Sequence, residues 1–301
     1  MEMNAKTMEI LFPNLLDKYQ VTKTIGMGGF SRVFEVIRLR DGKHFACKTN
    51  SMMGDDKLIL QELKIMAQLR HDPGVVRLVG IVRDLGFCHI IMELCEGTLL
   101  SRLPLGEDEA ALVVAKVAGT LQRMHALGMA HNDIKPGNVL ISYDSEVKVA
   151  DFGLSWQKGQ EKGALMRGGT ARYMPPGERF KESCDIWALG VTLYEMLTGK
   201  IAYEELQTPQ VLSELERYED LPLILFDWSR VPVLAKDLML GMLNLDKKKR
   251  LTAAQILEHP WIKRITQNYN RPAPETKVEV EAKQDVRTEL IVGGQASVPM
   301  Y

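Results

Sequence analysis

A change in the spacing of apolar residues near residue 97 constrains the fold of this chain more than any other feature. Before that point, short runs rich in β-branched and aromatic residues alternate with glycine-containing turns such as Asp41-Gly42, which is typical of an antiparallel sheet. Residues 55–70 instead repeat apolar side chains at helical spacing. The first third therefore predicts a sheet with a single helix, the strands lying at 19–26, 32–39, 43–49, 77–82 and 89–94.

Beyond residue 97 the pattern is helical. The longest amphipathic stretch, residues 107–127, carries acidic side chains in its first turn, where they complement the helix dipole. Further helices are expected at 185–197, 231–245 and 252–258. A strand-rich part followed by a helix-rich part indicates an α+β chain of two lobes, and 301 residues with 46% hydrophobic content are enough to build both.

The two ends of the chain differ from this middle part. Residues 1–18 predict a lead-in segment that is partly helical. We expect a flexible C-terminal tail at 264–301, because the stretch after about residue 270 is charged, contains prolines and has no helical apolar stripe.

Composition argues against several classes of partner. A formal net charge of −1 gives no reason to expect binding to nucleic acid or to an anionic membrane, and no apolar run approaches the roughly 18 residues that a membrane-spanning helix needs. The N-terminus lacks the basic and apolar regions of a signal peptide. The cysteines show no paired spacing, which predicts reduced thiols and a cytoplasmic or nuclear location; they are Cys47, Cys88, Cys95 and Cys184.

The first candidate for chemistry is the glycine-rich sequence IGMGGFSRVF at residues 25–34. It lies between two predicted strands, whereas the glycine turn of a dinucleotide-binding fold is followed by a helix. A glycine-rich hairpin can instead lay its backbone over the phosphates of a nucleotide. The same sequence also suits a simple tight turn, so the motif alone leaves both readings open.

A second candidate is Lys48, which ends the otherwise apolar strand sequence FACK. Burial of an ammonium group requires a partner, and the helix that follows offers Glu62. An ion pair between the two would direct Lys48 toward the phosphates of a nucleotide. The alternative is a salt bridge on the surface.

A third cluster, AHNDIKPGNVLI at residues 130–141, brings Asp133, Lys135 and Asn138 together within six residues. Phosphoryl transfer needs a carboxylate to orient the incoming hydroxyl, a cation near the moving phosphate and oxygen ligands for magnesium. Downstream, Asp151 lies on a turn after a predicted strand, where its carboxylate suits Mg²⁺. Taken alone, Asp151 is also an ordinary turn residue.

Taken together and in this order, these clusters resemble the motifs of the eukaryotic protein kinase family. The resemblance covers residues 19–263 and includes GTARYM at 169–174, DIWALG at 185–190 and Arg250. It implies the two-lobed protein kinase fold. The expected parts are a small antiparallel sheet lobe with one helix at 19–93, a hinge at about 94–97, and a larger, mostly helical lobe at 98–263.

The resemblance also implies ATP and Mg²⁺ as cofactors, and it implies a role for each matched residue. Asp133 would orient the substrate hydroxyl, and Lys135 would steady the γ-phosphate. Lys48, held by Glu62, would contact the α- and β-phosphates, and Thr170 would bond to Asp133 and Lys135. The implied metal ligands are Asn138 and Asp151; the implied nucleotide-binding residues are Ile25, Gly26, Met27, Gly28, Gly29, Val33, Ala46, Lys48, Met92, Glu93, Cys95 and Leu140; and the implied apolar stack between the lobes includes Met66, His131 and Phe152.

Several positions depart from the family pattern. Ser31 replaces the third glycine of the loop, and Asn132 stands where most members have arginine. The sequence PPGE at 175–178 replaces the usual Ala-Pro-Glu, which we interpret as an insertion that lets Glu178 reach Arg250. The hinge is one glycine shorter than usual.

Lys135 and the Gly169-Thr170 pair resemble the Ser/Thr branch of the family, and the HPWI ending resembles the calcium/calmodulin-dependent group. We therefore expect a monomeric enzyme that phosphorylates Ser or Thr residues of protein substrates. The departures at Asn132 and Pro175–Glu178 raise a second reading, a binding scaffold with the fold but without turnover. A third reading is a small-molecule kinase of related fold, although the stretch 169–174 resembles a peptide-holding segment.

The departure at Asn132 also bears on regulation. Many kinases hold a phosphate of the activation segment on the arginine before the catalytic aspartate, and Asn132 carries no charge for that purpose. Between Asp151 and Thr170 the only hydroxyl side chain is Ser155. We therefore expect activity that does not require phosphorylation of this segment.

Overall fold

The computed structural model describes residues 5–28, 31–52, 56–159, 170–176, 181–203 and 226–269. The chain divides into two units, Met1–Tyr269 and Asn270–Tyr301, and the described residues all lie in the first. Three predictions fall outside the described residues: the flexible tail beyond residue 269, the contact of Gly29 with nucleotide, and the approach of Glu178 to Arg250.

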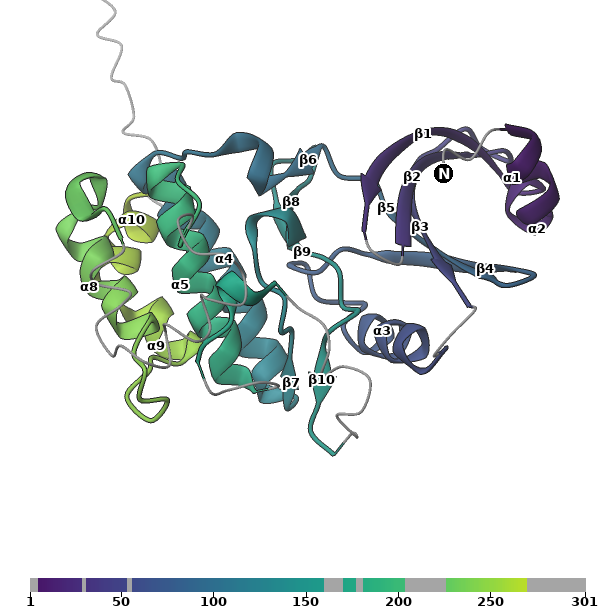
Figure 1. The fold of residues 1–301 in the computed structure, drawn as a ribbon. Helices are drawn as coiled ribbons and strands as arrows, with labels where there is room; N and C mark the ends of the chain where they lie inside the picture. Colours follow the sequence, from purple (N-terminus) through teal and green to yellow (C-terminus); the bar gives the residue numbers. More distant parts are fainter. Residues whose placement is uncertain are drawn as a thin grey trace, which may run out of the picture. The chain divides into compact units, whose positions relative to one another are not determined.

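Five antiparallel strands form the sheet of the smaller lobe, in the order β1-β2-β3-β5-β4 (Figure 1). The predicted strands are all present, with ends that differ from the prediction by one or two residues: β1 Tyr19–Met27, β2 Ser31–Arg38, β3 His44–Ser51, β4 Leu78–Asp84 and β5 Phe87–Glu93. The predicted helix is α3, Asp56–Gln68. The expected small antiparallel lobe with one following helix is thus confirmed.

Strand β3 lies in the middle of this sheet and carries Lys48, whose neighbours are Val33 on β2 and Ile90 on β5. Successive side chains of a strand point to opposite faces of the sheet, so Lys48 and Thr49 face opposite ways. Ile90, on the same face as Lys48, packs in one core cluster with α3. The two faces of β3 therefore contact different parts of the protein.

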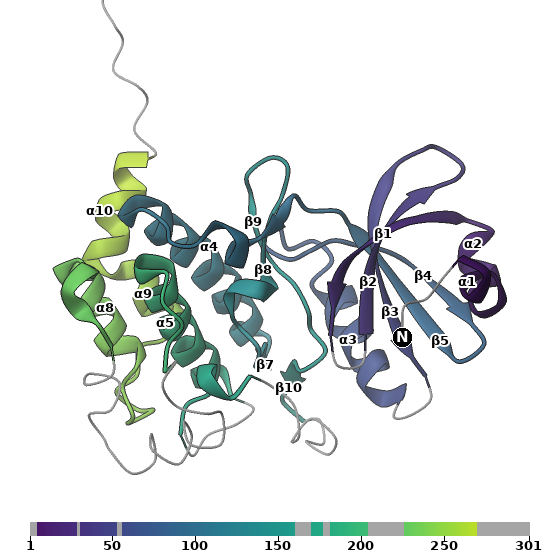
Figure 2. The same ribbon diagram turned by 45° about the horizontal axis from the view of Figure 1, so that its top comes forward.

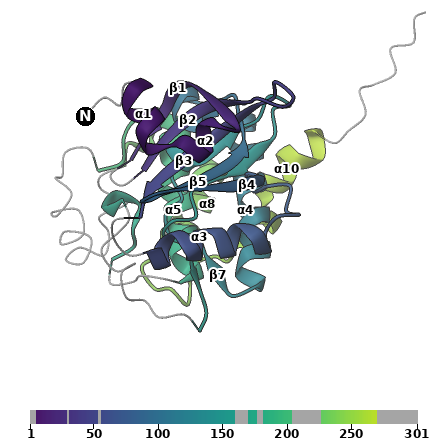
Figure 3. The ribbon, with the colours of Figure 1, turned by 90° about the vertical axis from the view of Figure 1, so that its right-hand side faces the viewer.

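The lead-in segment forms two short helices, α1 Ala5–Leu11 and α2 Pro13–Leu16. Phe12 and Leu15 are fully buried in a hydrophobic cluster with apolar side chains of the sheet. Figure 3 shows these helices on the side of the sheet opposite α3. The described part of the lead-in segment, residues 5–18, is therefore packed on the smaller lobe and completes its second hydrophobic cluster.

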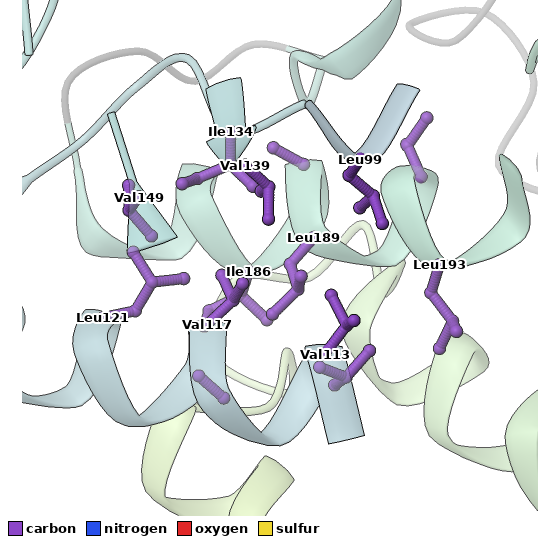
Figure 4. Packing of buried hydrophobic residues seen from close by; sticks show 14 of the residues in the cluster. Leu99, Val113, Val117, Leu121, Ile134, Val139, Val149, Ile186, Leu189 and Leu193 are labelled. Carbon is purple, nitrogen blue, oxygen red and sulfur yellow. The ribbon is translucent and has the colours of Figure 1, made fainter. Parts of the chain in front are cut away.

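The larger lobe is mostly helical, as predicted. Its core is built where α4 and α5 pack against each other and against the short strands β8 and β9 (Figure 4). The helices are α4 Glu107–Ala126, α5 Glu182–Thr198, α8 Val233–Met242, α9 Ala253–Glu258 and α10 Pro260–Tyr269. The labelled core residues are Val113, Val117 and Leu121 on α4, Ile186, Leu189 and Leu193 on α5, and Leu99, Ile134, Val139 and Val149 from the strands and loops packed against these helices.

Helix α10 was not predicted, and residues 264–269, assigned to the tail from the sequence, form its second half. Proline at the first position of a helix is well tolerated, since the amide it lacks would have no partner in the helix. Trp261 is fully buried, and its Nε1 donates a hydrogen bond of 2.8 Å to Glu107 Oε1 on α4. This tertiary contact holds α10 against α4.

Short strands lie between the five-stranded sheet and the helices of the larger lobe, and the loops after β7 and β9 follow from them (Figure 2). They are β6 Gly97–Thr98, β7 Met129–Ala130, β8 Val139–Ile141, β9 Val147–Val149 and β10 Trp156–Gln157. Strand β10 pairs with β7, and β6, β8 and β9 form a sheet of their own. None of the helices in the described ranges has the length and apolar character needed to cross a membrane.

Candidate active site

The loop after β7 is hydrogen-bonded to Asp185, a fully buried residue of α5. The Asp185 carboxylate accepts hydrogen bonds from the backbone amides of His131, at 2.9 Å, and Asn132, at 2.7 Å. His125 Nε2 lies 2.9 Å from the same carboxylate. Asn132 adopts a left-handed backbone conformation with φ of 63°, which asparagine tolerates better than most residues. Asp185 thus fixes the start of this loop.

Asp133 is the centre of a polar cluster that includes three other predicted residues. Its Oδ2 lies 2.7 Å from Lys135 Nζ and accepts a hydrogen bond of 2.7 Å from Asn138 Nδ2. Its Oδ1 accepts a hydrogen bond from Thr170 Oγ1, which also accepts one of 2.9 Å from Lys135 Nζ. The contacts expected of Thr170 with Asp133 and Lys135 are therefore present.

The predicted ion pair between Lys48 and Glu62 is also present, and Lys48 has a second acidic partner. Lys48 Nζ lies 2.6 Å from Glu62 Oε1 and 2.7 Å from Asp151 Oδ1. The side chains of Lys48 and Glu62 are buried, whereas that of Asp151 is 45% exposed. One ammonium group therefore links strand β3, helix α3 and the turn after β9.

The pKa shifts of these three groups follow from that arrangement. Burial favours the neutral form of Lys48, but the charges of Glu62 and Asp151 outweigh it and raise the pKa of the ammonium. Burial raises the pKa of Glu62, and Lys48 opposes this rise. Burial would also raise the pKa of Asp151, but the charge and hydrogen bond of Lys48 outweigh it and lower that pKa. Asp151 is therefore the carboxylate that stays most readily ionised.

The residues expected to form an apolar stack between the lobes lie in the hydrophobic core or pack against its members. His131 and Phe152 are fully buried and meet edge to face, with ring centroids 5.1 Å apart. His131 Nε2 lies 3.1 Å from the carbonyl oxygen of Ala150. Met66 of α3 belongs to the same core cluster as Phe152. The helix that carries Glu62 and the turn that carries Asp151 thus share one core.

The predicted nucleotide-binding residues come from five places in the fold. Ile25, Gly26, Met27, Gly28 and Val33 lie on the β1–β2 hairpin, Ala46 on β3, Met92 and Glu93 on β5, Cys95 just after β5, and Leu140 on β8. Gly26 pairs with Val33, and Ala46 with Met92. The Glu93 amide donates to the carbonyl of Arg77, so only its carbonyl is left to meet adenine. Gly29 lies outside the described residues.

The segment that follows Phe152 is held by neutral hydrogen bonds. Asn132 Nδ2 donates to the carbonyl of Leu154, at 3.2 Å, and the Oγ of the fully buried Ser155 donates to the carbonyl of His131, also at 3.2 Å. Gln61 of α3 donates its side-chain amide to the carbonyl of Ser155. Strand β10 then pairs with β7. Sequence reasoning missed these contacts because side-chain-to-backbone bonds between distant segments leave no pattern in the sequence.

The turn at 170–174 is fixed to helix α5, the same helix that binds the loop after β7. Tyr173 donates its hydroxyl to Glu195 Oε2 at 2.8 Å, and the amide of Ala202 donates to Glu195 Oε1. Burial raises the pKa of Glu195. The roles of Asp185 and Glu195 were also missed from the sequence, although an acidic residue in a strongly apolar helix is a recognisable signal of a buried polar contact.

The residues at the candidate metal position fit magnesium. Asn138 turns its amide nitrogen toward Asp133, which leaves its side-chain oxygen as a ligand atom, and one oxygen of Asp151 is bound by Lys48. Within the described residues no group of three or more His, Cys, Asp or Glu side chains could hold a metal. Two oxygen ligands suit Mg²⁺, which usually keeps water and substrate phosphates in the rest of its coordination shell.

Comparison with known proteins agrees with this geometry. The family model for the protein kinase domain matches residues 19–262, so the chain belongs to the protein kinase family. Within that family it is similar to Ser/Thr and calcium-dependent kinases, as the sequence motifs predict.

Three relatives from Arabidopsis thaliana illustrate the similarity. Calcium-dependent protein kinase 19 is 32% identical over 87% of this chain and 50% of its own length. Calcium-dependent protein kinase 12 is 33% identical over 83% of this chain and 54% of its own length. Serine/threonine-protein kinase PEPKR2 is 31% identical over 82% of this chain and 53% of its own length. The chain therefore spans about half the length of these relatives.

The Lys48 arrangement leads to a prediction about stability. Replacing Lys48 with methionine removes the cation that opposes the raised pKa of Glu62, so that pKa should rise further. An acid whose folded pKa exceeds its unfolded pKa destabilises the fold as pH rises above the ordinary glutamate value of about 4.3. We expect the variant to lose about 3 kcal/mol of unfolding free energy at pH 8 and clearly less at pH 5, as measured by urea unfolding.

The matched control is Lys64→Met, which removes an exposed lysine from the same helix that carries Glu62. It should change the unfolding free energy by less than about 0.5 kcal/mol at either pH. An equal loss at pH 5 and pH 8 in Lys48→Met would contradict the account.

Proposed function

We propose that this chain transfers the γ-phosphate of ATP to serine or threonine hydroxyls of protein substrates. The observation that carries the proposal is the bonded cluster of Asp133, Lys135, Asn138 and Thr170, which lies in the same unit as the Lys48–Asp151 pair. In such a transfer the bond between the γ-phosphorus and the β-phosphate oxygen breaks, a bond to the substrate oxygen forms, and the substrate hydroxyl loses its proton.

Asp133 is the proposed partner of the substrate hydroxyl. Its carboxylate is fixed by Lys135 and Asn138 on one oxygen and by Thr170 on the other, so it would not need to reorient when substrate binds. Lys135, held between Asp133 and Thr170, has a cationic group placed to accompany the transferred phosphate. Catalysis of this kind rests on positioning and on charge stabilisation more than on covalent chemistry.

The nucleotide would be held by the β1–β2 hairpin and by Lys48. The Lys48 ammonium is fixed by Glu62 and would contact the α- and β-phosphates. Asn138 and Asp151 would hold magnesium through their side-chain oxygens, and the bound ion would neutralise charge on the phosphates. Ala46, Leu140 and the residues after Met92 would enclose the adenine.

A scaffold without turnover is the competing function, and the structure gives it no specific support. Lys48, Asp133, Asn138 and Asp151 all carry the groups that the chemistry needs, and each makes a polar contact with another of the residues assigned to the site. The departure at Asn132 removes a charge that binds a regulatory phosphate elsewhere in the family. It does not remove a group assigned to the transfer itself.

The second part of the proposal is that activity does not depend on a phosphate in the activation segment. At the position of Asn132, many kinases have an arginine that binds the phosphate of the activation segment. Asn132 instead donates a neutral hydrogen bond to the Leu154 carbonyl. Ser155 is fully buried, and its hydroxyl is already bonded to the carbonyl of His131. In many kinases a phosphate is needed to order the activation segment. Here the start of the segment is ordered by neutral hydrogen bonds, without an added charge.

We assign the catalytic domain to residues 19–263 and expect it to be a monomer. We expect the protein to lie in the cytoplasm or nucleus and to bind neither nucleic acid nor membranes. Support for a reducing compartment comes from the cysteines, because none of the four forms a disulfide bond and Cys47, Cys88 and Cys184 are buried.

The catalytic role of Asp133 is tested by Asp133→Asn. This change keeps the shape of the side chain and removes its charge, so turnover of Mg-ATP with a serine peptide should fall about 100-fold or more. Binding of ATP, measured by calorimetric titration, should stay nearly unchanged. The control is Asp144→Asn in the exposed turn after β8, which should keep the parent rate. A parent-like rate for Asp133→Asn would reject the assigned catalytic loop.

Independence from phosphorylation is tested on purified enzyme treated with a broad phosphatase. After mass spectrometry confirms that no phosphate is present, initial rates are measured before autophosphorylation can occur. Because the segment is held by neutral hydrogen bonds, we expect a rate within about twofold of the untreated enzyme. A large loss of rate, restored when a residue between 152 and 173 is phosphorylated again, would overturn this part of the proposal.

A further inference from the structure

The first turn of helix α2 receives its cap from a distant strand. Asp84, at the end of β4, accepts hydrogen bonds from the backbone amides of Asn14, at 2.8 Å, and Leu15, at 3.1 Å. Amides in the first turn of a helix have no partner within the helix, and Phe12 at the capping position has no side-chain oxygen to offer. The carboxylate of Asp84 therefore ties the N-terminal segment to the sheet.

The same carboxylate contacts a buried histidine. His89 Nε2 lies 3.2 Å from Asp84 Oδ2, and both side chains are fully buried. The Phe12 ring packs edge to face on the imidazole, with centroids 4.8 Å apart. On the other side of the ring, His89 Nδ1 shares a hydrogen bond of 2.9 Å with Thr49 Oγ1. A series of buried contacts thus leads from the N-terminal helices to strand β3.

This series ends next to Lys48. Thr49 directly follows Lys48 on β3, and the two side chains lie on opposite faces of the sheet. On one face, Lys48 is held by Glu62 and Asp151; on the other, Thr49 is held by His89. The backbone hydrogen bonds of the sheet fix the register of β3, but the twist of a strand also responds to how the side chains on its two faces pack.

We propose that the N-terminal helices, acting through the series Asp84–His89–Thr49, position strand β3 so that Lys48 is set at its place in the active site. This inference rests on the proposed function, because it assigns a use to the position of Lys48. It makes His89 and Thr49 positioning residues, which act through Lys48 and touch neither ATP nor the substrate. It also gives residues 5–17 a role within the catalytic unit.

The protonation of His89 suits this role. Burial lowers the pKa of the imidazole, while the neighbouring carboxylate of Asp84 acts in the opposite direction. A neutral imidazole can share a hydrogen bond with the Thr49 hydroxyl through Nδ1 without adding a buried charge, while Nε2 faces the Asp84 carboxylate at 3.2 Å without a hydrogen bond.

The deciding experiment compares two substitutions of one residue in the full chain. Thr49→Val keeps the shape of the side chain and removes the hydroxyl that meets His89, whereas Thr49→Ser keeps the hydroxyl and removes a methyl group. If the hydroxyl positions β3, the kcat of Thr49→Val should fall about 10-fold with an unchanged KM for the peptide, and Thr49→Ser should keep at least half of the parent kcat. A purely packing role would produce the opposite order.

A second pair tests the N-terminal segment itself. Phe12→Ala removes the ring that covers His89, and its matched control, Ile10→Ala, removes an apolar side chain that is 72% exposed on the neighbouring helix. Phe12→Ala should lower kcat as Thr49→Val does and should speed hydrogen exchange of the β3 amides; Ile10→Ala should do neither. Thermal unfolding of each variant establishes that rates are measured on folded protein, and if Phe12→Ala does not fold, the Thr49 pair decides.

The outcomes separate this inference from the proposed function. A parent protein without kinase activity would reject the proposed function, and the exchange of β3 amides in the same variants would still test the positioning of the strand. An active parent protein whose Thr49→Val variant has an unchanged kcat and unchanged β3 exchange would overturn the inference.

Discussion

A buried ammonium group is stable only if acidic partners surround it, and that requirement organises the active site of this kinase. Lys48 is held by one carboxylate from α3 and by another from the turn after β9. The three parts of the chain must therefore lie in one arrangement for the charge to be compensated. The shared hydrophobic core of Met66 and Phe152 supports that arrangement with apolar packing beneath the charges.

A second buried charge does the same for the catalytic loop. Asp185 binds two successive backbone amides, and the loop beyond them presents Asp133 to Lys135 and Thr170. Many kinases use a phosphate in the activation segment to stabilise this region. Here the side chain of Asn132 instead donates a neutral hydrogen bond to the carbonyl of Leu154. The contacts of Lys48 and Asp185, together with this neutral bond, give a site in which the residues assigned to catalysis already contact one another.

The strands, the helix after them and the long amphipathic helix could be predicted because their apolar spacing is regular over many residues. The Lys48–Glu62 pair could be predicted because a lysine in an apolar strand needs a partner. Helix α10 was missed, although Trp261, Ile262 and Ile265 have the spacing of one helix face; what the sequence does not reveal is the bond between Trp261 and Glu107, 154 positions apart. The contacts of Asp84 with α2 were equally invisible, because a backbone amide can pair with any nearby acceptor. The spacing of apolar residues thus predicted helices and strands, whereas the hydrogen bonds between distant segments, which fix how these elements pack, could not be predicted from it.

The central claim is that Lys48 and Glu62 act as one unit in the chain without any added phosphate. The most direct measurement is a double-mutant cycle on the dephosphorylated enzyme, with Lys48→Met, Glu62→Gln and both changes together, read out as kcat/KM for ATP. If Glu62 acts by holding Lys48, the double variant should be about as impaired as Lys48→Met alone, with a coupling of about 2 kcal/mol. Losses that simply add would contradict the claim.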